Sequence, residues 1–404
     1  MSTPWLTIIG IGENGLAGLS AEAKAALAGA EFVFGGARHL ALARAGARGV
    51  AWPVPFSVEP LLACKPTRVV ALCSGNPFWF GAGSVLAEAL TPEEWVALPA
   101  PSSFSLAASR LGWRLEETIC LGLHAAPFAR ARRHLAPGAR LICLLRGPEA
   151  VAPFAAWLGA QGFGASRLWR LEALGGARER ILAGRVDEFM DEFMDEFMAM
   201  APGLGPLAMA VEVAGAPGLP RTPGLPDELF EHDGQITRRA IRALTLSALA
   251  PRAREHLWDI GAGSGSISIE WLLATGNGRA SALEADAARA ARALGNAGAF
   301  GVEERLILLE RRAPDGLAEL ARPDAVFIGG GASEALLEAL WALAPAGTRL
   351  VANGVTLESE ALFTSWAAVK GGALLRLEMA EAAPLGRLRG WVPARPILQW
   401  SVSL

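Results

Sequence analysis

The stretch HLWDIGAGSGSISIEWLL, residues 256–273, decides the fold of this chain. Its apolar start predicts a strand, and the glycines Gly261, Gly263 and Gly265 predict a tight turn. The apolar residues that follow have helical spacing. A strand, a glycine turn and a helix open a nucleotide-binding α/β unit. A glycine-rich structural turn is the alternative interpretation of this stretch alone.

Two carboxylates near the turn indicate which ligand it binds. Asp259 stands just before Gly261, where it would repel the pyrophosphate that a dinucleotide places at the helix N-terminus. S-adenosylmethionine has no phosphate, and its amino cation can pair with such a carboxylate. Glu284 lies at the expected end of the next strand, where a carboxylate binds ribose hydroxyls. We therefore predict that Asp259, Gly261, Gly263, Gly265 and Glu284 bind S-adenosylmethionine.

The composition indicates an ordered protein of more than one domain. The 404 residues suffice for two or three domains, and 52% of them are hydrophobic while 19% are charged. The net charge is −3 and neither half is basic, which argues against a nucleic-acid partner. Arginine far outnumbers lysine, which suits carboxylate binding through a planar fork and equally suits a bias in codon usage.

The cysteines and the apolar runs bear on the cellular compartment. Cys64, Cys73, Cys120 and Cys143 are scattered, which predicts reduced thiols and no metal site. Residues 1–30 show no signal peptide, and no apolar run is long enough to span a membrane. We therefore expect a soluble, cytoplasmic protein with no membrane partner.

The stretch AGAPGLPRTPGLP, residues 214–226, predicts a semi-rigid linker between domains 1–213 and 227–404. Strands alternate with helices on both sides of the linker, which predicts an α/β fold. The C-terminal domain is expected to have a doubly wound, largely parallel sheet, whose last strands could be antiparallel. Ser20 is expected to cap a helix over 21–28, and Thr237 one over 238–249. The expected strands are 5–12, 31–34, 69–73, 140–145, 166–171, 207–213, 280–284, 305–310, 325–328, 349–352, 374–380 and 397–401.

Residues 187–198 are three copies of Asp-Glu-Phe-Met. The period of four places Phe and Met on one face of an amphipathic helix. We interpret it as a solvated helix lengthened by tandem duplication, with a partner-docking helix as the alternative.

The N-terminal half carries glycine-rich loops at expected strand ends. Its Gly10-x-Gly12-x-x-Gly15 pattern is weak evidence for a dinucleotide, because the second strand ends at Phe34 with no carboxylate after it. The loop SGNPFWFGAG, residues 74–83, follows another strand at the edge where α/β proteins bind ligands. An ordinary turn is the alternative there.

Further stretches carry a family resemblance. With WDIGAGSGSI, the segments DGQITR (233–238), DAVFIGGG (324–331) and VANGVTLE (351–358) resemble the decarboxylating tetrapyrrole methyltransferases of cobalamin biosynthesis, which have a Rossmann-like class I fold. The N-terminal half resembles the two-lobed class III tetrapyrrole methylases through Gly10-x-Gly12, Ser74-Gly-Asn-Pro77, Pro101-Ser-Ser103 and LGGARERI (174–181). Asn76 departs from the Asp that related methylases often carry, so a charge is lost there.

The resemblance implies a bifunctional enzyme that uses two molecules of S-adenosylmethionine on a tetrapyrrole. Residues 1–213 would methylate C5 of precorrin-6B, and residues 227–404 would methylate C15 and decarboxylate the ring C acetate, giving precorrin-8X. It also implies a homo-oligomer built on the C-terminal domain. The donor contacts implied, beyond those predicted above, are Gly10, Gly12, Ser74, Gly75, Asn76, Ser102, Ser103, Thr237 and Ala313.

The implied chemistry needs positioning more than a strong protein base. In-line placement supplies much of the rate, and the reduced macrocycle provides both nucleophilic carbons and an electron sink. His124 is a candidate for acting at a substrate carboxylate or carrying a proton, with a polar loop histidine as the alternative. Asn353 is a candidate by its place at a strand end. Arg238, Arg239 and Arg242 would hold carboxylate arms or are solvated.

Two other functions stay open at this point. The chain could be a methyltransferase fusion acting on another tetrapyrrole, on protein or on RNA, although the absence of a basic face weighs against RNA. One half could also be a degenerate binding or oligomerisation module, which Asn76 makes more plausible for the N-terminal half.

Overall fold

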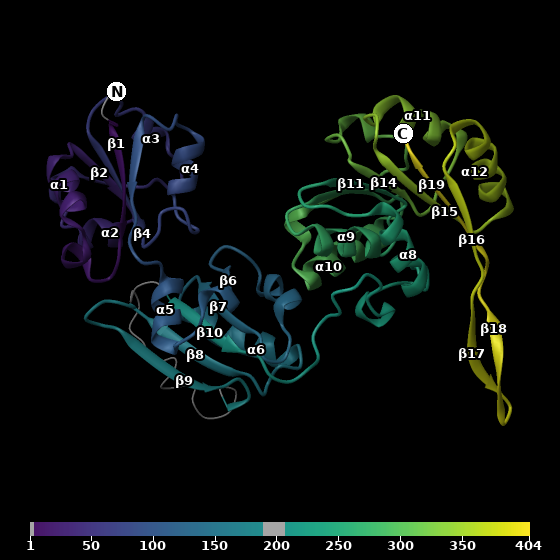
Figure 1. Cartoon of the computed structure of the whole chain (residues 1–404), viewed down its shortest axis with the longest axis horizontal. Helices are drawn as coiled ribbons and strands as arrows, with labels where there is room; N and C mark the ends of the chain where they lie inside the picture. Colours follow the sequence, from purple (N-terminus) through teal and green to yellow (C-terminus); the bar gives the residue numbers. More distant parts are fainter. Residues whose placement is uncertain (1–3, 189–206) are drawn as a thin grey trace. The chain divides into compact units, whose positions relative to one another are not determined.

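The computed structural model describes residues 4–188 and 207–404 and divides the chain into two compact units (Figure 1). Unit 1 comprises Met1–Phe128 and His134–Gly218, and unit 2 comprises Ala129–Arg133 and Leu219–Leu404.

The first sheet of unit 1 is parallel, with strand order β3-β2-β4-β1-β5. Its central strands are nearly continuous apolar runs that are buried on both faces, as parallel strands require. Ser20 caps α1 as expected, because its Oγ accepts a hydrogen bond from the Ala23 amide at 3.1 Å. The elements are β1 (Leu6–Ile11), α1 (Ala21–Gly29), β2 (Phe32–Gly35), α2 (Ala37–Leu42), β3 (Gly49–Ala51), α3 (Glu59–Leu62), β4 (Val69–Ser74), α4 (Gly83–Glu88) and β5 (Trp95–Leu98).

The second sheet of unit 1 is mostly antiparallel, with strand order β6-β7-β10-β8-β9. Phe104 and Ala107 of the helix α5 pack with Trp169 and Leu171 on one face of this sheet. The sequence did not predict β9, whose side chains alternate between exposed and half-buried at the edge of the sheet. The elements are α5 (Ser103–Leu111), β6 (Thr118–Gly122), β7 (Arg140–Leu145), α6 (Val151–Ala160), β8 (Arg167–Glu172), β9 (Arg180–Arg185) and β10 (Leu207–Glu212).

Unit 2 is built on a seven-stranded sheet with order β13-β12-β11-β14-β15-β19-β16. The first five strands are parallel, and β19 pairs antiparallel with β15 and β16, so the expected α/β fold is confirmed. The elements are α8 (Arg239–Leu249), β11 (His256–Ile260), α9 (Ser266–Thr275), β12 (Arg279–Leu283), α10 (Ala287–Phe300), β13 (Leu306–Leu309), β14 (Ala325–Ile328), α11 (Glu334–Leu343), β15 (Arg349–Gly354), α12 (Leu357–Lys370), β16 (Ala373–Leu377) and β19 (Ile397–Ser403).

Helices cover both faces of this sheet. Leu257 of β11 packs into the apolar cluster that contains residues of α8, α9 and α10, while its neighbour Trp258 packs into the cluster of α11 and α12. Consecutive strand residues point to opposite faces, so the apolar run at 257–260 is explained by burial on both sides.

Two local predictions for unit 2 are wrong. The expected strand 374–380 ends at Leu377, and the chain continues into β17 (Ala380–Leu385) and β18 (Leu388–Pro393). These two strands pair only with each other and form an arm that extends away from the large sheet (Figure 1). Thr237 does not cap α8, because Arg238 holds the N-cap position and no side chain caps this helix.

The Asp-Glu-Phe-Met repeat lies almost wholly outside the described residues. Only Asp187 and Glu188 of the predicted helix fall within them, in a turn after β9 where Asp187 pairs with Arg185. In the described ranges, no helix is long and apolar enough to cross a membrane.

Candidate active sites

The glycine turn of unit 2 connects β11 to α9 with a backbone that only glycine adopts easily. Gly261, Gly263 and Gly265 have φ of +70°, +57° and +73°. A Cβ on Gly261 would lie 2.9 Å from the backbone of Gly330, and a Cβ on Gly265 would lie 3.0 Å from Cβ of Ala293. The nearest atom to a Cβ on Gly263 would be 3.9 Å away, so the turn leaves open space beside that glycine.

Asp259 carries a buried carboxylate with one unused oxygen. Its side chain is fully buried, and Oδ2 accepts hydrogen bonds from the amide and hydroxyl of Ser268 at 3.1 and 2.6 Å. Oδ1 has no hydrogen-bond partner among the described residues. Burial, together with the negative charge of Glu284, raises the pKa of Asp259 to about 6. A buried acceptor of this kind calls for a cationic donor, as the amino group of S-adenosylmethionine provides.

Glu284 follows β12 directly and holds the glycine turn. Its Oε2 accepts a hydrogen bond from the Gly263 amide at 2.8 Å, and its Oε1 accepts one from the Asp286 amide at 3.0 Å. A carboxylate has about four acceptor sites, so both oxygens keep capacity for ribose hydroxyls. The two carboxylates and the open glycine turn therefore fit a cationic nucleoside.

Thr237 and Ala313 are the other predicted donor contacts of unit 2. The Gln235 carbonyl is the atom nearest to a Cβ built on Gly263, which brings the segment containing Thr237 to the glycine turn. Ala313 packs against the apolar cluster of α11 and α12.

The three arginines at the start of α8 have different surroundings. Arg239 donates a hydrogen bond from Nε to the Gly224 carbonyl at 2.9 Å. For Arg242 both the substrate-binding prediction and the alternative of a solvated arginine are wrong, because its side chain is fully buried. It pairs with Glu270 at 2.5 Å and Asp227 at 3.0 Å and donates to the carbonyls of Thr237 and Leu225. The side chain of Arg238, in contrast, is 63% exposed, and its ion pair with Asp227 is a loose contact of 3.8 Å. Arg238 is therefore available to a ligand.

Asn353 lies within β15, one residue before the strand ends. Its Nδ2 donates to Oγ1 of Thr245 at 2.8 Å, and its Oδ1 accepts from Nε2 of Gln399 at 3.0 Å. Thr245 and Gln399 are both buried. The amide thus joins α8, β15 and β19, and its predicted catalytic role stays a prediction.

In unit 1, glycines allow the ends of β1 and β4 and the loop after β5 to meet backbone to backbone. A Cβ on Gly10 would lie 1.8 Å from the Gly75 carbonyl oxygen. Gly75 has φ of +53°, and a Cβ there would lie 2.8 Å from Cα of Ser102. The predicted donor contacts Gly10, Gly75 and Ser102 are therefore neighbours. Gly12 follows β1, with Asn14 Oδ1 3.0 Å from where its Cβ would be.

The serines and the asparagine predicted to contact the donor also support local structure. Ser102 caps α5, since its Oγ accepts from the Ser105 amide at 3.1 Å, and Ser103 is the first residue of that helix. Asn76 Oδ1 accepts from the Phe78 amide at 3.0 Å and so stabilises the turn after β4. This bond needs no charge, which is why asparagine suffices for it.

A polar cluster that the sequence did not predict surrounds Ser74. The Ser74 hydroxyl lies 2.8 Å from both Arg38 Nη2 and His39 Nε2, and Arg38 forms an ion pair with the buried Glu13. Glu13, Arg38 and His39 follow β1 and β2, which neighbour β4 in the sheet. Their position just after the ends of strands is the sequence feature from which Glu13, Arg38 and His39 could have been predicted as site residues.

His39 is a neutral imidazole with a defined proton. Arg38 Nη2 lies 2.9 Å from His39 Nε2, and because a guanidinium only donates, Nε2 accepts and the proton resides on Nδ1. Nδ1 is buried and has no hydrogen-bond partner in the described ranges. Burial, and then the charge of Arg38, lowers the pKa of His39 to about 4.

His124 lies apart from these hydrogen bonds, just after β6. Its side chain is exposed, and its ring lies edge-on to Phe80 with 6.4 Å between the ring centroids. Its carbonyl accepts a hydrogen bond from Arg146 Nε at 3.1 Å. An exposed histidine beside an aromatic ring and an arginine is open to a ligand.

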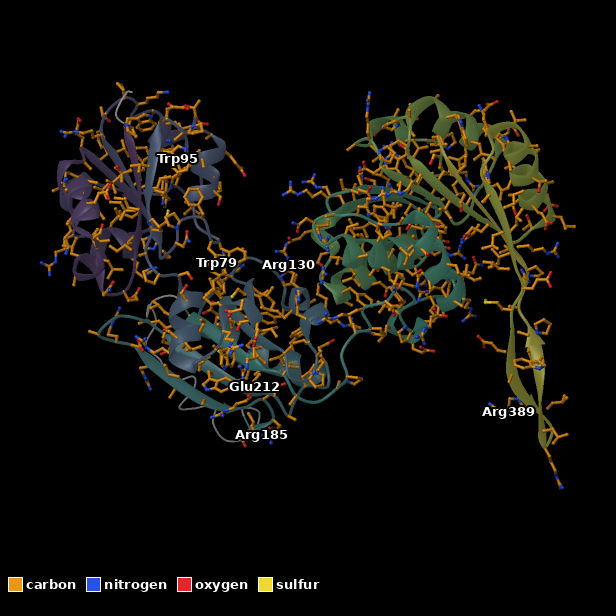
Figure 2. All side chains as sticks on the ribbon, in the orientation of Figure 1. Trp79, Trp95, Arg130, Arg185, Glu212 and Arg389 are labelled. Atoms are coloured by element: carbon orange, nitrogen blue, oxygen red, sulfur yellow. The ribbon has the colours of Figure 1, made fainter. Side chains whose placement is uncertain are left out.

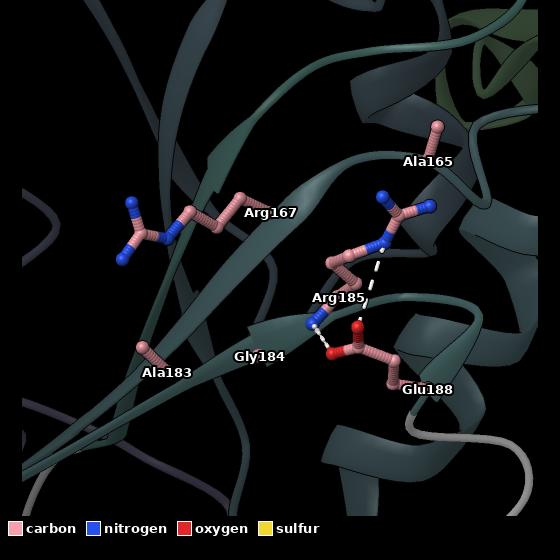
Figure 3. Close-up of a pocket in the computed structure, with 6 residues that line it drawn as sticks. All are labelled: Ala165, Arg167, Ala183, Gly184, Arg185 and Glu188. Carbon is pink, nitrogen blue, oxygen red and sulfur yellow. Dashed lines mark hydrogen bonds and ion pairs between the residues drawn. The ribbon is translucent and has the colours of Figure 1, made fainter.

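A pocket of about 390 Å³ lies elsewhere, at the edge of the second sheet, and none of the predicted site residues lines it (Figure 3). Glu188 accepts a hydrogen bond from the Arg185 amide there and pairs with its guanidinium, so this cation is already compensated. The pocket is lined by Ala165, Arg167, Ala183, Gly184, Arg185 and Glu188. Within residues 4–188 and 207–404, no group of three or more histidine, cysteine or acidic side chains could hold a metal ion.

Comparisons with known proteins match both halves of the chain. A family model described as tetrapyrrole (corrin/porphyrin) methylases matches residues 5–190, and one described as a precorrin methyltransferase domain matches residues 228–404. A relative from Sinorhizobium sp., named precorrin-6Y C(5,15)-methyltransferase [decarboxylating], is 48% identical over 99% of this chain and 96% of its own length. A Mycobacterium tuberculosis relative of the same name is 36% identical over 98% of this chain and 99% of its own.

A shorter relative matches one part of the chain. A Pyrobaculum calidifontis protein named probable cobalt-precorrin-6B C(15)-methyltransferase (decarboxylating) is 41% identical over 34% of this chain and 73% of its own length. The full-length matches span both α/β units. The chain therefore belongs to the family of decarboxylating precorrin-6Y C(5,15)-methyltransferases, which are S-adenosylmethionine-dependent C-methyltransferases.

Proposed function

We propose that this chain methylates C5 and C15 of a corrin precursor, precorrin-6B, and decarboxylates its ring C acetate to give precorrin-8X. The observation that carries the proposal is the full-length match to relatives named for both methylations and for decarboxylation. The scattered free cysteines support a reducing, cytoplasmic setting, and the net charge of −3 gives no support to a nucleic-acid partner.

Unit 2 would hold one donor molecule at the glycine turn. The unused Oδ1 of Asp259 would accept from the amino cation, and Glu284 would accept from the ribose hydroxyls. The left-handed glycines keep side chains out of this space. Bound S-adenosylmethionine supplies an electrophilic sulfonium methyl group. Arg238 would orient a carboxylate arm of the acceptor, because its guanidinium is exposed and weakly paired.

Unit 1 would hold the second donor where β1, β4 and the loop after β5 meet. Because the backbones of Gly10, Gly75 and Ser102 approach closely, main-chain N–H and C=O groups at this edge would contact the donor. The other predicted donor contacts beside them are Ser74, Asn76, Ser103 and Gly12. His124 would act at a substrate carboxylate or carry a proton, since its ring is exposed.

We assign C5 methylation to unit 1, and C15 methylation with decarboxylation to unit 2. The shorter Pyrobaculum relative supports a division of labour, since a protein named for C15 methylation and decarboxylation alone matches only 34% of the chain. Asn353 remains a candidate in unit 2, although its amide has two partners in the fold.

The division of labour is tested with the full chain, the tetrapyrrole acceptor and donor labelled with ¹³C in its methyl group. The wild type should give two labelled methyl resonances and one carbon dioxide per acceptor. Asp259→Asn should lose the C15 resonance and the carbon dioxide and keep the C5 resonance. Loss of the C5 resonance alone would contradict the assignment. Calorimetry that finds one donor site in place of two would favour the degenerate-module alternative for unit 1.

The β17–β18 arm supports a homo-oligomer built through unit 2. Leu385, Leu388 and Trp391 on the arm are 68%, 76% and 76% exposed. Large exposed apolar side chains on a protruding element are typical of an interface. Light scattering should show a lower mass for Trp391→Ser combined with Leu388→Ser than for the wild type, and an unchanged mass would contradict this proposal.

A further inference from the structure

The loop between β4 and α4 presents three aromatic side chains in a row to solvent. Phe78, Trp79 and Phe80 are 41%, 36% and 54% exposed. They come two to four residues after Asn76, at the carboxyl edge of the parallel sheet where α/β proteins bind ligands. Figure 2 shows Trp79 on this loop, between the first sheet and α5. Exposed aromatic area concentrated at a ligand-binding edge calls for an occupant.

The backbone of Phe80 is held in a conformation that bulky residues avoid. Its φ is +58°, in the left-handed region. A Cβ on Gly122 would lie 3.0 Å from Cδ1 of the Phe80 ring, so glycine at position 122 makes room for this ring. Phe80 is therefore positioned by its surroundings at a conformational cost, which is common at ligand-contacting sites.

The neighbours of the loop make it a firm apolar surface with a polar edge. Trp79 and Phe80 lie 4.8 and 5.9 Å, between ring centroids, from the buried Phe104 of α5. His124 lies edge-on to Phe80, and Arg146 is bonded to the His124 carbonyl. One side of each exposed ring is thus supported by protein, and a histidine and an arginine stand at the rim.

We propose that Trp79 and Phe80 are the surface on which unit 1 positions the macrocycle of the tetrapyrrole acceptor, with His124 and Arg146 toward its carboxylate arms. The inference rests on the proposed function. A corrin precursor combines a wide apolar ring with a rim of carboxylates, which matches aromatic rings bordered by cationic and proton-bearing groups. The adenine of the donor is also flat, but the donor carries a single carboxylate, on its methionine part, and one base needs fewer rings to cover it.

The test is Phe80→Gly in the full chain, because glycine removes the ring and also relieves the left-handed backbone. With ¹³C-methyl donor, the KM for the acceptor in C5 methylation should rise about tenfold, equivalent to about 1.4 kcal/mol. The kcat should stay within about twofold, and the C15 methylation rate and the dissociation constant of the donor should not change. Phe80→Tyr keeps the ring and should restore the acceptor KM.

The matched control is Phe32→Ala. Phe32 is 38% exposed and is the first residue of β2, at the opposite, amino edge of the same sheet. Its removal should leave the KM values for the acceptor and for the donor in C5 methylation unchanged. A tenfold loss of donor affinity in Phe80→Gly with an unchanged acceptor KM would overturn the proposal in favour of adenine stacking. An equal KM in Phe80→Gly and wild type would overturn it outright. Absence of C5 methylation in the wild type would refute the proposed function instead.

Discussion

Replacing Asp259 with asparagine separates what this buried carboxylate costs the fold from what it contributes to donor binding. Asparagine has the same shape, and its oxygen can accept the two hydrogen bonds from Ser268. Raising a carboxyl pKa from 3.8 to about 6 corresponds to about 3 kcal/mol against the ionised form. We expect Asp259→Asn to stabilise ligand-free unit 2 by about 1–3 kcal/mol at pH 7.5.

The sign of this effect depends on pH in a defined way. Below pH 3.8 the carboxyl is protonated in both the folded and the unfolded chain, so the variant and the wild type should be equally stable. Because the folded pKa is raised, the wild type loses stability as the pH rises toward and through about 6. The advantage of the variant should therefore grow over that range and then level off. Hydrogen exchange of the β11 amides with increasing urea reports this for unit 2 alone.

Donor binding should respond in the opposite direction. Only the ionised carboxylate pairs with the amino cation, so wild-type affinity for S-adenosylmethionine at this site should fall about tenfold from pH 7.5 to pH 5, following the pKa near 6. Asp259→Asn should bind more weakly at pH 7.5 and show no such pH dependence by calorimetry. A destabilised variant, or a wild-type affinity that is flat across this range, would refute the reasoning.

Four further substitutions give distinct outcomes. Gly261→Ala forces a Cβ to 2.9 Å from the Gly330 backbone at a φ of +70°, so it should cost unit 2 about 1–3 kcal/mol and abolish donor binding at the site of unit 2, measured by unfolding and calorimetry. Arg242→Ala removes the ion-pair partner of the buried Glu270 and should destabilise unit 2 by about 3–5 kcal/mol. Arg238 is exposed, so Arg238→Ala should leave the free energy of unfolding unchanged and raise the acceptor KM for C15 methylation. Equal free energies of unfolding for the two variants would be evidence against this contrast. His124→Gln should slow C5 methylation and spare C15 methylation in the ¹³C assay, and equal loss of both would contradict its proposed role in C5 methylation.

The sequence predicts best where the structural reason is local. The strand, turn and helix around Gly261–Gly265 occupy one short segment, and Glu284 follows the next strand of the same motif, so their arrangement could be predicted without the rest of the fold. The fold class follows for the same reason, because apolar runs and glycine turns alternate along both halves.

Residues whose role depends on distant partners could not be predicted. Arg242 has the sequence environment of a surface arginine, and it is buried only because Glu270 and Asp227, 28 and 15 positions away, compensate its charge. His39 belongs to no motif and acquires its partner Ser74 only when β2 and β4 pair. The arm was missed because Ala380–Leu385 and Leu388–Pro393 lack the alternation of a half-buried strand.

The β17–β18 arm has a consequence for how readily this protein is cleaved by proteases in solution. A two-stranded hairpin without a core is marginally stable in water, and this arm pairs with no other strand of the described chain. Its order must therefore be supplied by whatever covers its apolar side chains. The rate at which a protease cleaves beside Arg387 or Arg389 therefore reports how often the arm is uncovered. If another copy of the chain covers the arm, this cleavage rate should increase on dilution.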